Sequence, residues 1–355
     1  MSIDSAEVRA QRLGGASQRG VSRWGGWGAM RACGLFGVAL GALVACGGGS
    51  PNPGINQTMS SIASSGCSGG DQSTASASSN NAGSSQPSGN SHSTSSSKSP
   101  GTSTGATGVV PGSATSNTIT VNGTDRTYVL YTPSTYNGST PLPLIVAFHG
   151  DGGTGESLRE WFNIEPTVAE QAIIVYPDGL NATWEIDQIG GLMADVNFVD
   201  AVVDDLATNG CIAINRLYAT GISRGAYFTN QMVCRSAHTW RAVVTHSGGG
   251  PYNAVGENNF TCKKQIAALQ VHGDADDTVN QSEGWKPSDF WCSANGCNSC
   301  PASESQPTAS VPYSQPPCMT YNGCKQPEVW CLIPGLNHEF WSQAAKVTWD
   351  FFSQH

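Results

Sequence analysis

Apolar residues are distributed unevenly along the 355-residue chain. Residues 47–116 are nearly all Ser, Gly, Asn, Thr and Ala, so this stretch buries too little apolar surface to offset the entropy lost on folding. Bulky aliphatic and aromatic residues return at residue 117 and continue to the last residue. The pattern predicts a disordered linker at 47–116 and one folded domain of roughly 240 residues at 117–355, long enough for a full core.

Six short apolar segments of the domain show little alternation with polar positions, which is typical of strands buried on both faces of a parallel sheet. A hairpin is predicted before them, because two β-prone runs at 118–121 and 126–131 flank Asn122-Gly123, a strong signal for a tight turn. The six buried strands are predicted at 144–148, 172–176, 216–220, 241–246, 266–271 and 329–333.

Helical segments are predicted between these strands, at 157–171, 196–208, 224–236 and 343–353. The second of them has a suitable end signal in Asn209-Gly210. Strands that alternate with helices indicate an α/β fold. We therefore expect three layers, with a mostly parallel central sheet between two layers of helices.

The apolar run at 34–45 follows Arg31 and has about twelve residues, which is too short to span a bilayer and is typical of a signal peptide. It ends in Leu43-Val44-Ala45-Cys46, which resembles the bacterial lipobox, whose cysteine is acylated. We therefore expect residues 1–46 to be a signal segment and Cys46 to carry the lipid anchor. Because Gly47 rather than Asp follows, the predicted location is the outer membrane or cell surface; without acylation, the protein would be secreted.

The net charge of −9 arises from 17 basic and 26 acidic residues, and the domain has no cluster of Lys and Arg. Nucleic acids and anionic membrane surfaces require such a cluster, so neither is an expected partner. The predicted contact with a membrane is made only through the lipid anchor.

Ten cysteines follow the predicted signal segment, and an exported chain with so many is by default a disulfide protein. Nine of them lie in the domain, an odd number, so we expect Cys67 of the linker to pair with one of these. Cys297 and Cys300 have the spacing of a zinc or redox pair, but predicted export and Pro301, without a thioredoxin-like pattern, favour structural disulfides. We expect no metal and no cofactor.

The sequence Gly221-Ile222-Ser223-Arg224-Gly225 lies between a predicted strand and a predicted helix. This context is what the nucleophile elbow of serine hydrolases requires, since the turn is too sharp for side chains at the two glycine positions. The serine is then presented at a helix N-terminus, where free amides favour a developing negative charge. Ser223 is therefore the candidate nucleophile.

A serine nucleophile needs a base and an acid that orients it, and in this fold they follow in the order Ser, acid, His. His338 lies in a loop between the last predicted strand and helix, so it is the candidate base. Asp276 is the candidate acid, ahead of Asp277 and Asp274, in a segment that follows the strand at 266–271. The spacing of these three aspartates could also serve calcium, but the rest of a calcium loop is missing.

The segment His149-Gly150-Asp151-Gly152-Gly153 follows the predicted strand at 144–148 and is glycine-rich. Glycines let the backbone approach a substrate closely, although they also occur in ordinary tight turns. We expect the backbone amides of Asp151 and Arg224 to form the oxyanion hole, which leaves His149 a structural role.

Taken together, these motifs resemble the branch of α/β-hydrolase esterases that contains feruloyl esterases and extracellular polyhydroxybutyrate depolymerases. The resemblance implies Ser223, Asp276 and His338 as nucleophile, acid and base. Arg224 and Glu339 depart from the family pattern by adding charge beside the site. The resemblance also extends over Arg126-Thr127-Tyr128-Val129, His149-Gly150, Pro177-Asp178-Gly179, Trp184, Asp195-Val196-Asn197-Phe198, residues 221–226, 272–276 and 335–338, and the cysteine-rich run at 318–331.

The cysteine-rich run and the Ser-Gly-Cys67 triplet are similar to feruloyl esterases in particular. The first hypothesis is therefore a serine carboxylic-ester hydrolase that releases hydroxycinnamic acids from plant cell-wall polysaccharide through an acyl-enzyme. The alternatives are a polyester depolymerase of the hydroxybutyrate type and a non-catalytic carbohydrate-binding lipoprotein. By analogy, Trp184 and Trp341 are expected to stack on the acyl group or on a sugar, although either could equally pack in the core.

Overall fold

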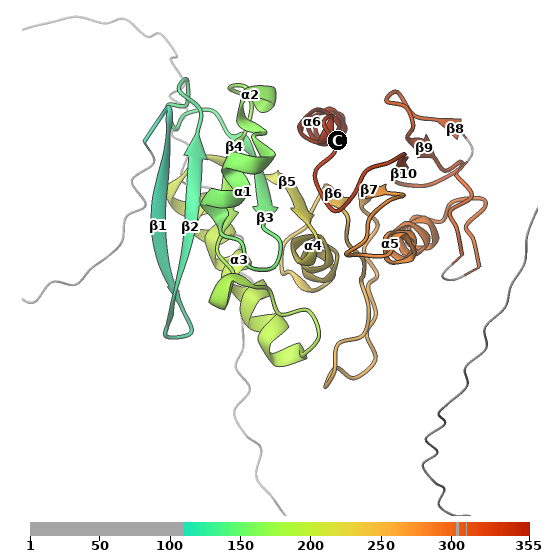
Figure 1. Cartoon of the computed structure of the whole chain (residues 1–355). Helices are drawn as coiled ribbons and strands as arrows, with labels where there is room; N and C mark the ends of the chain where they lie inside the picture. Colours follow the sequence, from blue (N-terminus) through green and yellow to red (C-terminus); the bar gives the residue numbers. More distant parts are fainter. Residues whose placement is uncertain (1–109, 303–304, 310) are drawn as a thin grey trace, which may run out of the picture. The chain divides into compact units, whose positions relative to one another are not determined.

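The computed structural model describes residues 110–302, 305–309 and 311–355 (Figure 1). The predicted signal segment, Cys46, Cys67 and most of the predicted linker lie outside these residues. Ten strands of the described part form one sheet in the order β1-β2-β4-β3-β5-β6-β7-β10-β9-β8. They are β1 Ser113–Val121, β2 Thr124–Thr132, β3 Leu142–Phe148, β4 Ile173–Pro177, β5 Ile212–Ile222, β6 Ala242–His246, β7 Ala267–Gly273, β8 Val311–Pro312, β9 Met319–Thr320 and β10 Glu328–Ile333.

The centre of the sheet is parallel and its edges are antiparallel. Strands β4, β3, β5, β6, β7 and β10 pair in parallel, whereas β1 pairs with β2, and β8 with β9, in antiparallel fashion. The alternation of side chains along a buried strand supplies two cores at once. In β3, Leu144, Val146 and Phe148 belong to one core, and Ile145 and Ala147 to the other.

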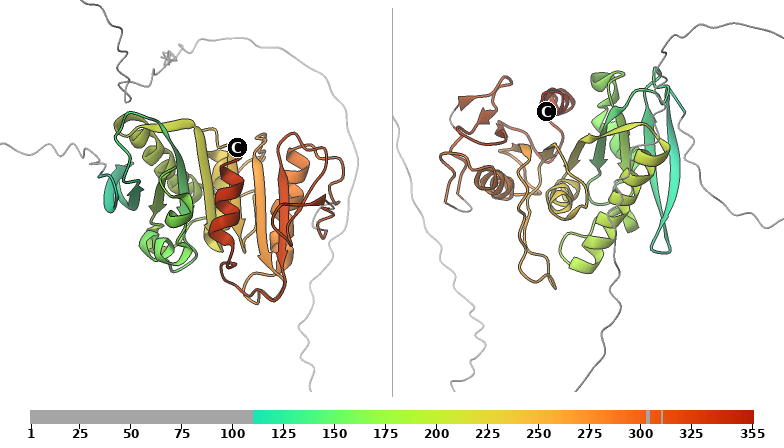
Figure 2. Two further views of the ribbon diagram at one scale, coloured as in Figure 1. Left: turned by 90° about the horizontal axis from the view of Figure 1, so that it is seen from above. Right: turned by 180° about the vertical axis from the view of Figure 1, so that it is seen from behind.

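Helices cover both faces of the sheet (Figures 1 and 2). One face packs against α3, α4 and α5, and the other against α1, α2 and α6. This three-layer arrangement agrees with the α/β fold predicted from the sequence. The helices are α1 Gly155–Phe162, α2 Glu165–Val168, α3 Ile189–Asn209, α4 Arg224–Arg235, α5 Gln281–Ala294 and α6 Ala344–Phe352, with a 3-10 turn η1 at Leu180–Ala182.

Several elements differ from the sequence prediction. Helix α3 begins at Ile189 rather than at residue 196, and β5 begins at Ile212 rather than at residue 216. Strand β1 begins at Ser113, so residues 113–116, which were predicted as linker, pair with β2; Ser113 faces Thr132. The single helix predicted at 157–171 is two helices, because Asn163 adopts a left-handed conformation and ends α1. Helix α5 was not predicted; Gly284 and Pro287 lie inside it and hide its periodicity.

Four disulfides join cysteines of the described part, as expected for structural cysteines. Cys297 and Cys300 do not pair with each other, and both sulfurs are held in disulfides rather than available as a thiolate pair. Cys211 is also disulfide-bonded. The four pairs are Cys234–Cys262, Cys292–Cys300, Cys297–Cys324 and Cys318–Cys331. None of the helices described is both long and apolar enough to cross a bilayer.

Candidate active site

The carboxyl ends of β5, β6 and β7 lie side by side, which brings the loops that follow them to one edge of the sheet. Ile222 pairs with His246, and His246 with Val271. Backbone hydrogen bonds continue this register one residue further, from Ser223 N to His246 O at 2.9 Å and from Ser247 N to Val271 O at 2.8 Å. Ligand and catalytic sites of open α/β sheets lie at this edge.

Ser223 occupies the sharp turn between β5 and α4. Its φ of 56° and ψ of −126° fall outside the regions that non-glycine residues normally adopt, which is typical of a strained functional position. A side chain at either flanking glycine would collide with backbone: a Cβ on Gly221 would lie 2.5 Å from Gly225 O, and one on Gly225 would lie 2.3 Å from Phe148 O. The serine itself is partly exposed, so a substrate can reach it.

Asp276 and His338 are in direct contact, although 62 residues separate them. Nδ1 of His338 lies 2.9 Å and 3.1 Å from the two carboxylate oxygens of Asp276, whose side chain is fully buried. Burial alone would raise the pKa of Asp276, but hydrogen bonds from His338 and from the amides of Thr278 and Val279 outweigh it and hold the pKa below its ordinary value. The carboxylate therefore stays ionised and fixes the proton of His338 on Nδ1.

The loops that carry this pair are tied together by the backbone. Asp274 N donates to Ile333 O, and Ala275 N donates to Leu336 O, both at 3.1 Å. The pair is also close to α4: burial and Glu283 raise the pKa of Tyr227, one turn after Ser223, and the charge of Asp276 adds to the effect. Among the described hydrogen bonds none joins Ser223 Oγ to His338, and such contacts often tighten only when substrate binds.

The glycine-rich loop after β3 lies against Ser223. A Cβ on Gly150 would lie 3.3 Å from Cβ of Ser223 and 3.9 Å from its Oγ. The backbone amides of Gly152 and Gly153 already donate hydrogen bonds within the protein, to Ala182 O and Gly150 O. The described backbone hydrogen bonds include none from the amides of Asp151 and Arg224, so these two predicted oxyanion donors are available to a ligand.

Hydrogen bonds of His149 and Trp184 support the glycine-rich loop. Gly179 N donates to Nε2 of His149 at 2.9 Å, so its proton is on Nδ1 and points to Gly150 O at 2.7 Å. Burial lowers the pKa of His149, with smaller opposing effects, so the ring is neutral. Nε1 of Trp184 donates to His149 O at 3.0 Å.

Of the two roles left open for Trp184, stacking on substrate and packing in the core, the structure shows packing in the core. Its side chain is fully buried, stacks on Phe228 with ring centroids 4.7 Å apart, and meets Phe148 edge to face at 5.2 Å. A ring enclosed in this way has no face to offer to a ligand. Trp341, by contrast, is only partly buried beside the His338 loop.

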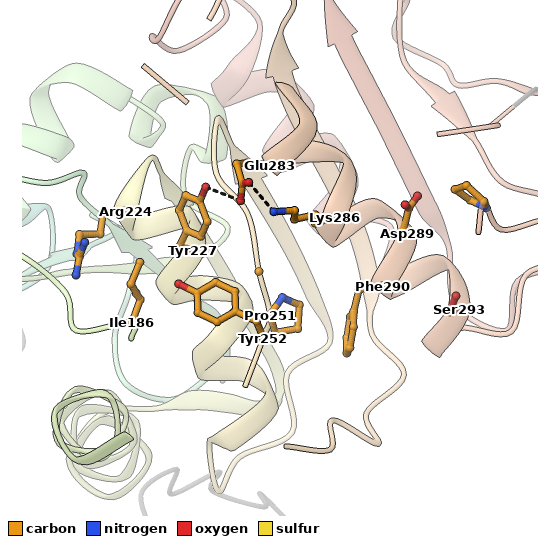
Figure 3. Close-up of a pocket in the computed structure, with 12 residues that line it drawn as sticks. Ile186, Arg224, Tyr227, Pro251, Tyr252, Glu283, Lys286, Asp289, Phe290 and Ser293 are labelled. Atoms are coloured by element: carbon orange, nitrogen blue, oxygen red, sulfur yellow. Dashed lines mark hydrogen bonds and ion pairs between the residues drawn. The ribbon is translucent and has the colours of Figure 1, made fainter. Parts of the chain in front are cut away.

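A cleft of about 830 Å³ opens beside Arg224 and Tyr227 of α4, on the side of the sheet covered by α4 and α5. Ser223, Asp276 and His338 are not among the residues that line it. Figure 3 shows aromatic rings on its walls, from Tyr227 of α4, Tyr252 of the loop after β6 and Phe290 of α5. Arg224 also lines it. The cleft therefore combines three aromatic rings with charged side chains.

Two charged clusters give the cleft its polar groups. Glu283 accepts hydrogen bonds from Tyr227 Oη at 3.1 Å and from Lys286 Nζ at 2.6 Å, as Figure 3 shows. Arg224 Nε donates to Trp184 O at 2.6 Å, and its guanidinium lies 3.7 Å from Asp187. Arg224 is therefore held in place by its neighbours.

The remaining candidates from the sequence have local partners. Asp274 accepts from Gly335 N at 2.6 Å, and Asp277 accepts from the hydroxyl of Thr278 at 3.2 Å. His246 is buried and lies 3.2 Å from Thr348 Oγ1, whereas His272 lies 2.9 Å from Val279 O.

Sequence reasoning missed most of the cleft. Tyr227 could have been found, because it follows Ser223 by four residues on a predicted helix and so lies on the same face. Tyr252 and Phe290 carry no such signal, since a loop and the unpredicted helix α5 bring them to the cleft.

Comparisons with known proteins bear on the family and the fold of the chain. A sequence model of the phospholipase/carboxylesterase family matches residues 185–308. Feruloyl esterase D of Neurospora crassa is 29% identical over 262 residues, covering 67% of this chain and 84% of that protein. Feruloyl esterase C of Emericella nidulans is 31% identical over 259 residues, covering 68% and 90%, and probable feruloyl esterase C of Aspergillus niger is 30% identical over 245 residues, covering 65% and 84%.

Among solved structures, the acetyl xylan esterase of Aspergillus awamori superposes with a TM-score of 0.54 and 16% sequence identity. The match covers 68% of this chain and all of that one. At this identity the likeness concerns the fold alone. It confirms the predicted α/β-hydrolase architecture.

Proposed function

Since the chain belongs to the feruloyl esterase branch of the α/β-hydrolases and is a carboxylic ester hydrolase, we propose that it releases hydroxycinnamic acids from plant cell-wall polysaccharide. The observation that carries the proposal is the contact between Asp276 and His338 at the sheet edge where Ser223 is presented. A hydroxycinnamoyl group is flat and aromatic, and the cleft lined by Tyr227, Tyr252 and Phe290 suits such a group.

In the proposed reaction Ser223 Oγ attacks the ester carbonyl while Nε2 of His338 takes its proton. The carbonyl oxygen becomes an oxyanion, and the amides of Asp151 and Arg224 donate to it. Asp276 stabilises the imidazolium that forms. The imidazolium then gives its proton to the departing alcohol oxygen, the C–O bond breaks and an acyl-enzyme remains. Water, deprotonated by His338, hydrolyses the acyl-enzyme and releases the acid and Ser223.

In this proposal Trp184 and Trp341 have different roles. Trp184 supports the oxyanion loop through its hydrogen bond to His149 O. Trp341, partly buried beside the His338 loop, is our candidate for direct contact with substrate.

Substrate preference is the test of this proposal. Purified protein is assayed on methyl ferulate and on a hydroxybutyrate oligomer, with Ser223→Ala as the inactive control. We expect a higher kcat/KM for methyl ferulate, because the cleft offers aromatic rings rather than a narrow aliphatic channel. A higher kcat/KM for the oligomer would contradict the feruloyl assignment and favour polyester hydrolysis instead.

We also propose that the enzyme is exported and anchored by a lipid on Cys46, so that the membrane contacts only the anchor. The four disulfides support export, because such bonds persist in oxidising compartments. Palmitate labelling in a Gram-negative host should give a labelled protein, and Cys46→Ser should abolish the label. Unlabelled wild-type protein in the culture medium would instead indicate a cleaved signal peptide and a secreted enzyme.

A further inference from the structure

Trp161, near the end of α1, presents its ring to solvent beside the His338 loop. It is 54% exposed and is the one aromatic residue among the large apolar side chains that the described part leaves exposed. Its ring meets Phe340 edge to face, with centroids 4.8 Å apart. Phe340 in turn stacks on Phe162 at 4.7 Å and contacts His246 at 5.1 Å. The exposed indole is therefore supported from behind and loses little entropy when a ligand covers it.

The indole lies on the opposite side of the sheet from the cleft. Phe162 belongs to the core beneath α1 and α6, with Phe340 packed against it, whereas Phe228 of α4 and Trp291 of α5 belong to the other core. Ser223 stands at the sheet edge between the two sides. The acyl and alcohol groups of an ester point in different directions from the carbonyl carbon. In the proposed reaction His338 gives its proton to the alcohol oxygen, so we place the alcohol group on the His338 side. Phe340 follows His338 by two residues and contacts Trp161.

The chemistry around Trp161 suits a neutral sugar. Sugar rings have an apolar face of C–H groups that packs on an exposed indole, and hydroxyls at the rim that donate to carboxylates. Two exposed carboxylates adjoin the aromatic pair: Glu160 precedes Trp161, and Glu339 precedes Phe340. Their negative charge disfavours an acidic sugar or an anionic membrane.

We infer that Trp161 and Phe340, with Glu160 and Glu339 at the rim, form a subsite for a neutral sugar ring in the alcohol portion of the substrate. The inference rests on the proposed function and deepens it, since it assigns the polysaccharide a place on this surface. In this inference the acyl and alcohol portions of the substrate bind on opposite sides of the sheet.

The first experiment compares two esters of ferulic acid that differ only in the alcohol, methyl ferulate and a feruloylated neutral oligosaccharide. We expect Trp161→Ala to raise KM for the oligosaccharide about tenfold, equivalent to about 1.4 kcal/mol, with kcat unchanged and methyl ferulate kinetics within about twofold. Trp161→Phe should retain most of the affinity because it keeps an aromatic face. Unchanged KM for the oligosaccharide, or an equal loss on both esters, would overturn the subsite.

Ile214→Ala is the matched control for removal of an exposed apolar side chain. Ile214 is 46% exposed and lies near the start of β5, nine residues before Ser223 and so about 30 Å away along an extended strand. Its substitution should change the kinetic constants for neither ester. A similar rise in KM would mean that the effect of Trp161→Ala is not local.

A binding measurement separates failure of the subsite from failure of the proposed function. Ser223→Ala protein is run through gels that contain soluble neutral arabinoxylan, with and without Trp161→Ala. Retardation that Trp161→Ala removes supports the subsite even if wild-type protein does not hydrolyse ferulates. Retardation that is absent or unaffected by Trp161→Ala overturns it.

Discussion

At the scale of single residues, His338 and Asp276 depend on each other. The buried carboxylate is kept ionised by hydrogen bonds from His338, Thr278 and Val279. It in turn holds the imidazole in the tautomer whose Nε2 is free to accept a proton. In the proposed reaction we therefore expect the pair to act as one unit that needs a charged carboxylate at position 276.

Replacing Asp276 by Asn keeps the size of the side chain but removes the charge that stabilises the imidazolium. We expect kcat to fall about 10³- to 10⁴-fold, with a small change in KM. Steady-state kinetics on methyl ferulate measure both constants. Asp277→Asn is the control, because Asp277 is exposed and the one described hydrogen bond of its carboxylate comes from the hydroxyl of its neighbour Thr278. Equal losses in the two variants would argue against a specific role for Asp276.

His246 is a second residue whose ionisation matters, here for stability. Complete burial lowers its pKa to about 3, whereas an exposed histidine titrates near 6.5. Between these values the unfolded chain binds a proton at His246 that the folded chain does not. The contribution of His246 to the free energy of unfolding is therefore fully present above pH 6.5 and is lost as the pH drops. His246→Gln removes this contribution. The difference in free energy of unfolding between the wild-type protein and His246→Gln should shrink by about 1 kcal/mol for each pH unit between pH 6 and pH 4.

Urea unfolding at several pH values measures this difference. Other buried histidines, such as His149 and His272, also have lowered pKa values and titrate in both proteins. They cancel when the two curves are subtracted. Curves that stay parallel from pH 7 to pH 4 would show that His246 is not responsible.

At the scale of elements, the turn between β5 and α4 is the feature on which the site depends. Gly225 lets α4 approach the end of β3, where its Cα faces Phe148 O and His149 O. This close approach places the amide of Arg224 beside the glycine-rich loop. We therefore expect the distance between the two elements to set the geometry of the proposed oxyanion donors.

Gly225→Ala should push the two elements apart, because its Cβ would lie 2.3 Å from Phe148 O. We expect kcat/KM to fall about 100-fold and the free energy of unfolding to fall by about 2 kcal/mol. Gly190→Ala in α3 is the control, since nothing lies within 4 Å of its Cβ position. It should leave activity unchanged and stability equal or slightly higher. Equal effects of the two substitutions would refute this account of the turn.

The sequence predicts the elements with local signals and misses those without them. The central strands, Ser223 and His338 could be placed because buried runs and the nucleophile turn are encoded within a few residues. Tyr252 reaches the cleft only through the fold. The burial of Trp184 depends on Phe148 and Phe228, which are distant in sequence. No local pattern distinguishes a tryptophan that supports a loop from one that contacts substrate.

At the scale of the whole molecule, disulfides add covalent links to the described domain, one of them between β10 and the residue that precedes β9. The four observed pairs use eight of the nine domain cysteines, and Cys211 is disulfide-bonded as well. With Cys67 predicted to pair with the domain, Cys211 is its expected partner. Such a bond would close a long loop and restrict the unfolded chain.

Peptide mapping of the non-reduced protein tests this pairing. We expect one cross-linked peptide that contains Cys67 and Cys211 and disappears on reduction. Cys67→Ser should then lower the midpoint of thermal unfolding. Reduction should lower this midpoint less in Cys67→Ser than in the wild-type protein, because the variant has already lost one disulfide. A free thiol at Cys67 would refute the prediction.

The central claim is that Ser223 is a nucleophile activated by His338 and Asp276. Fluorophosphonates react covalently with activated serines, so labelling followed by mass spectrometry identifies the residue directly. We predict a single adduct on Ser223, lost in Ser223→Ala and retained in Ser247→Ala, which changes the serine at the end of the neighbouring strand β6. No adduct on well-folded wild-type protein, or an adduct that persists in Ser223→Ala, would contradict the account.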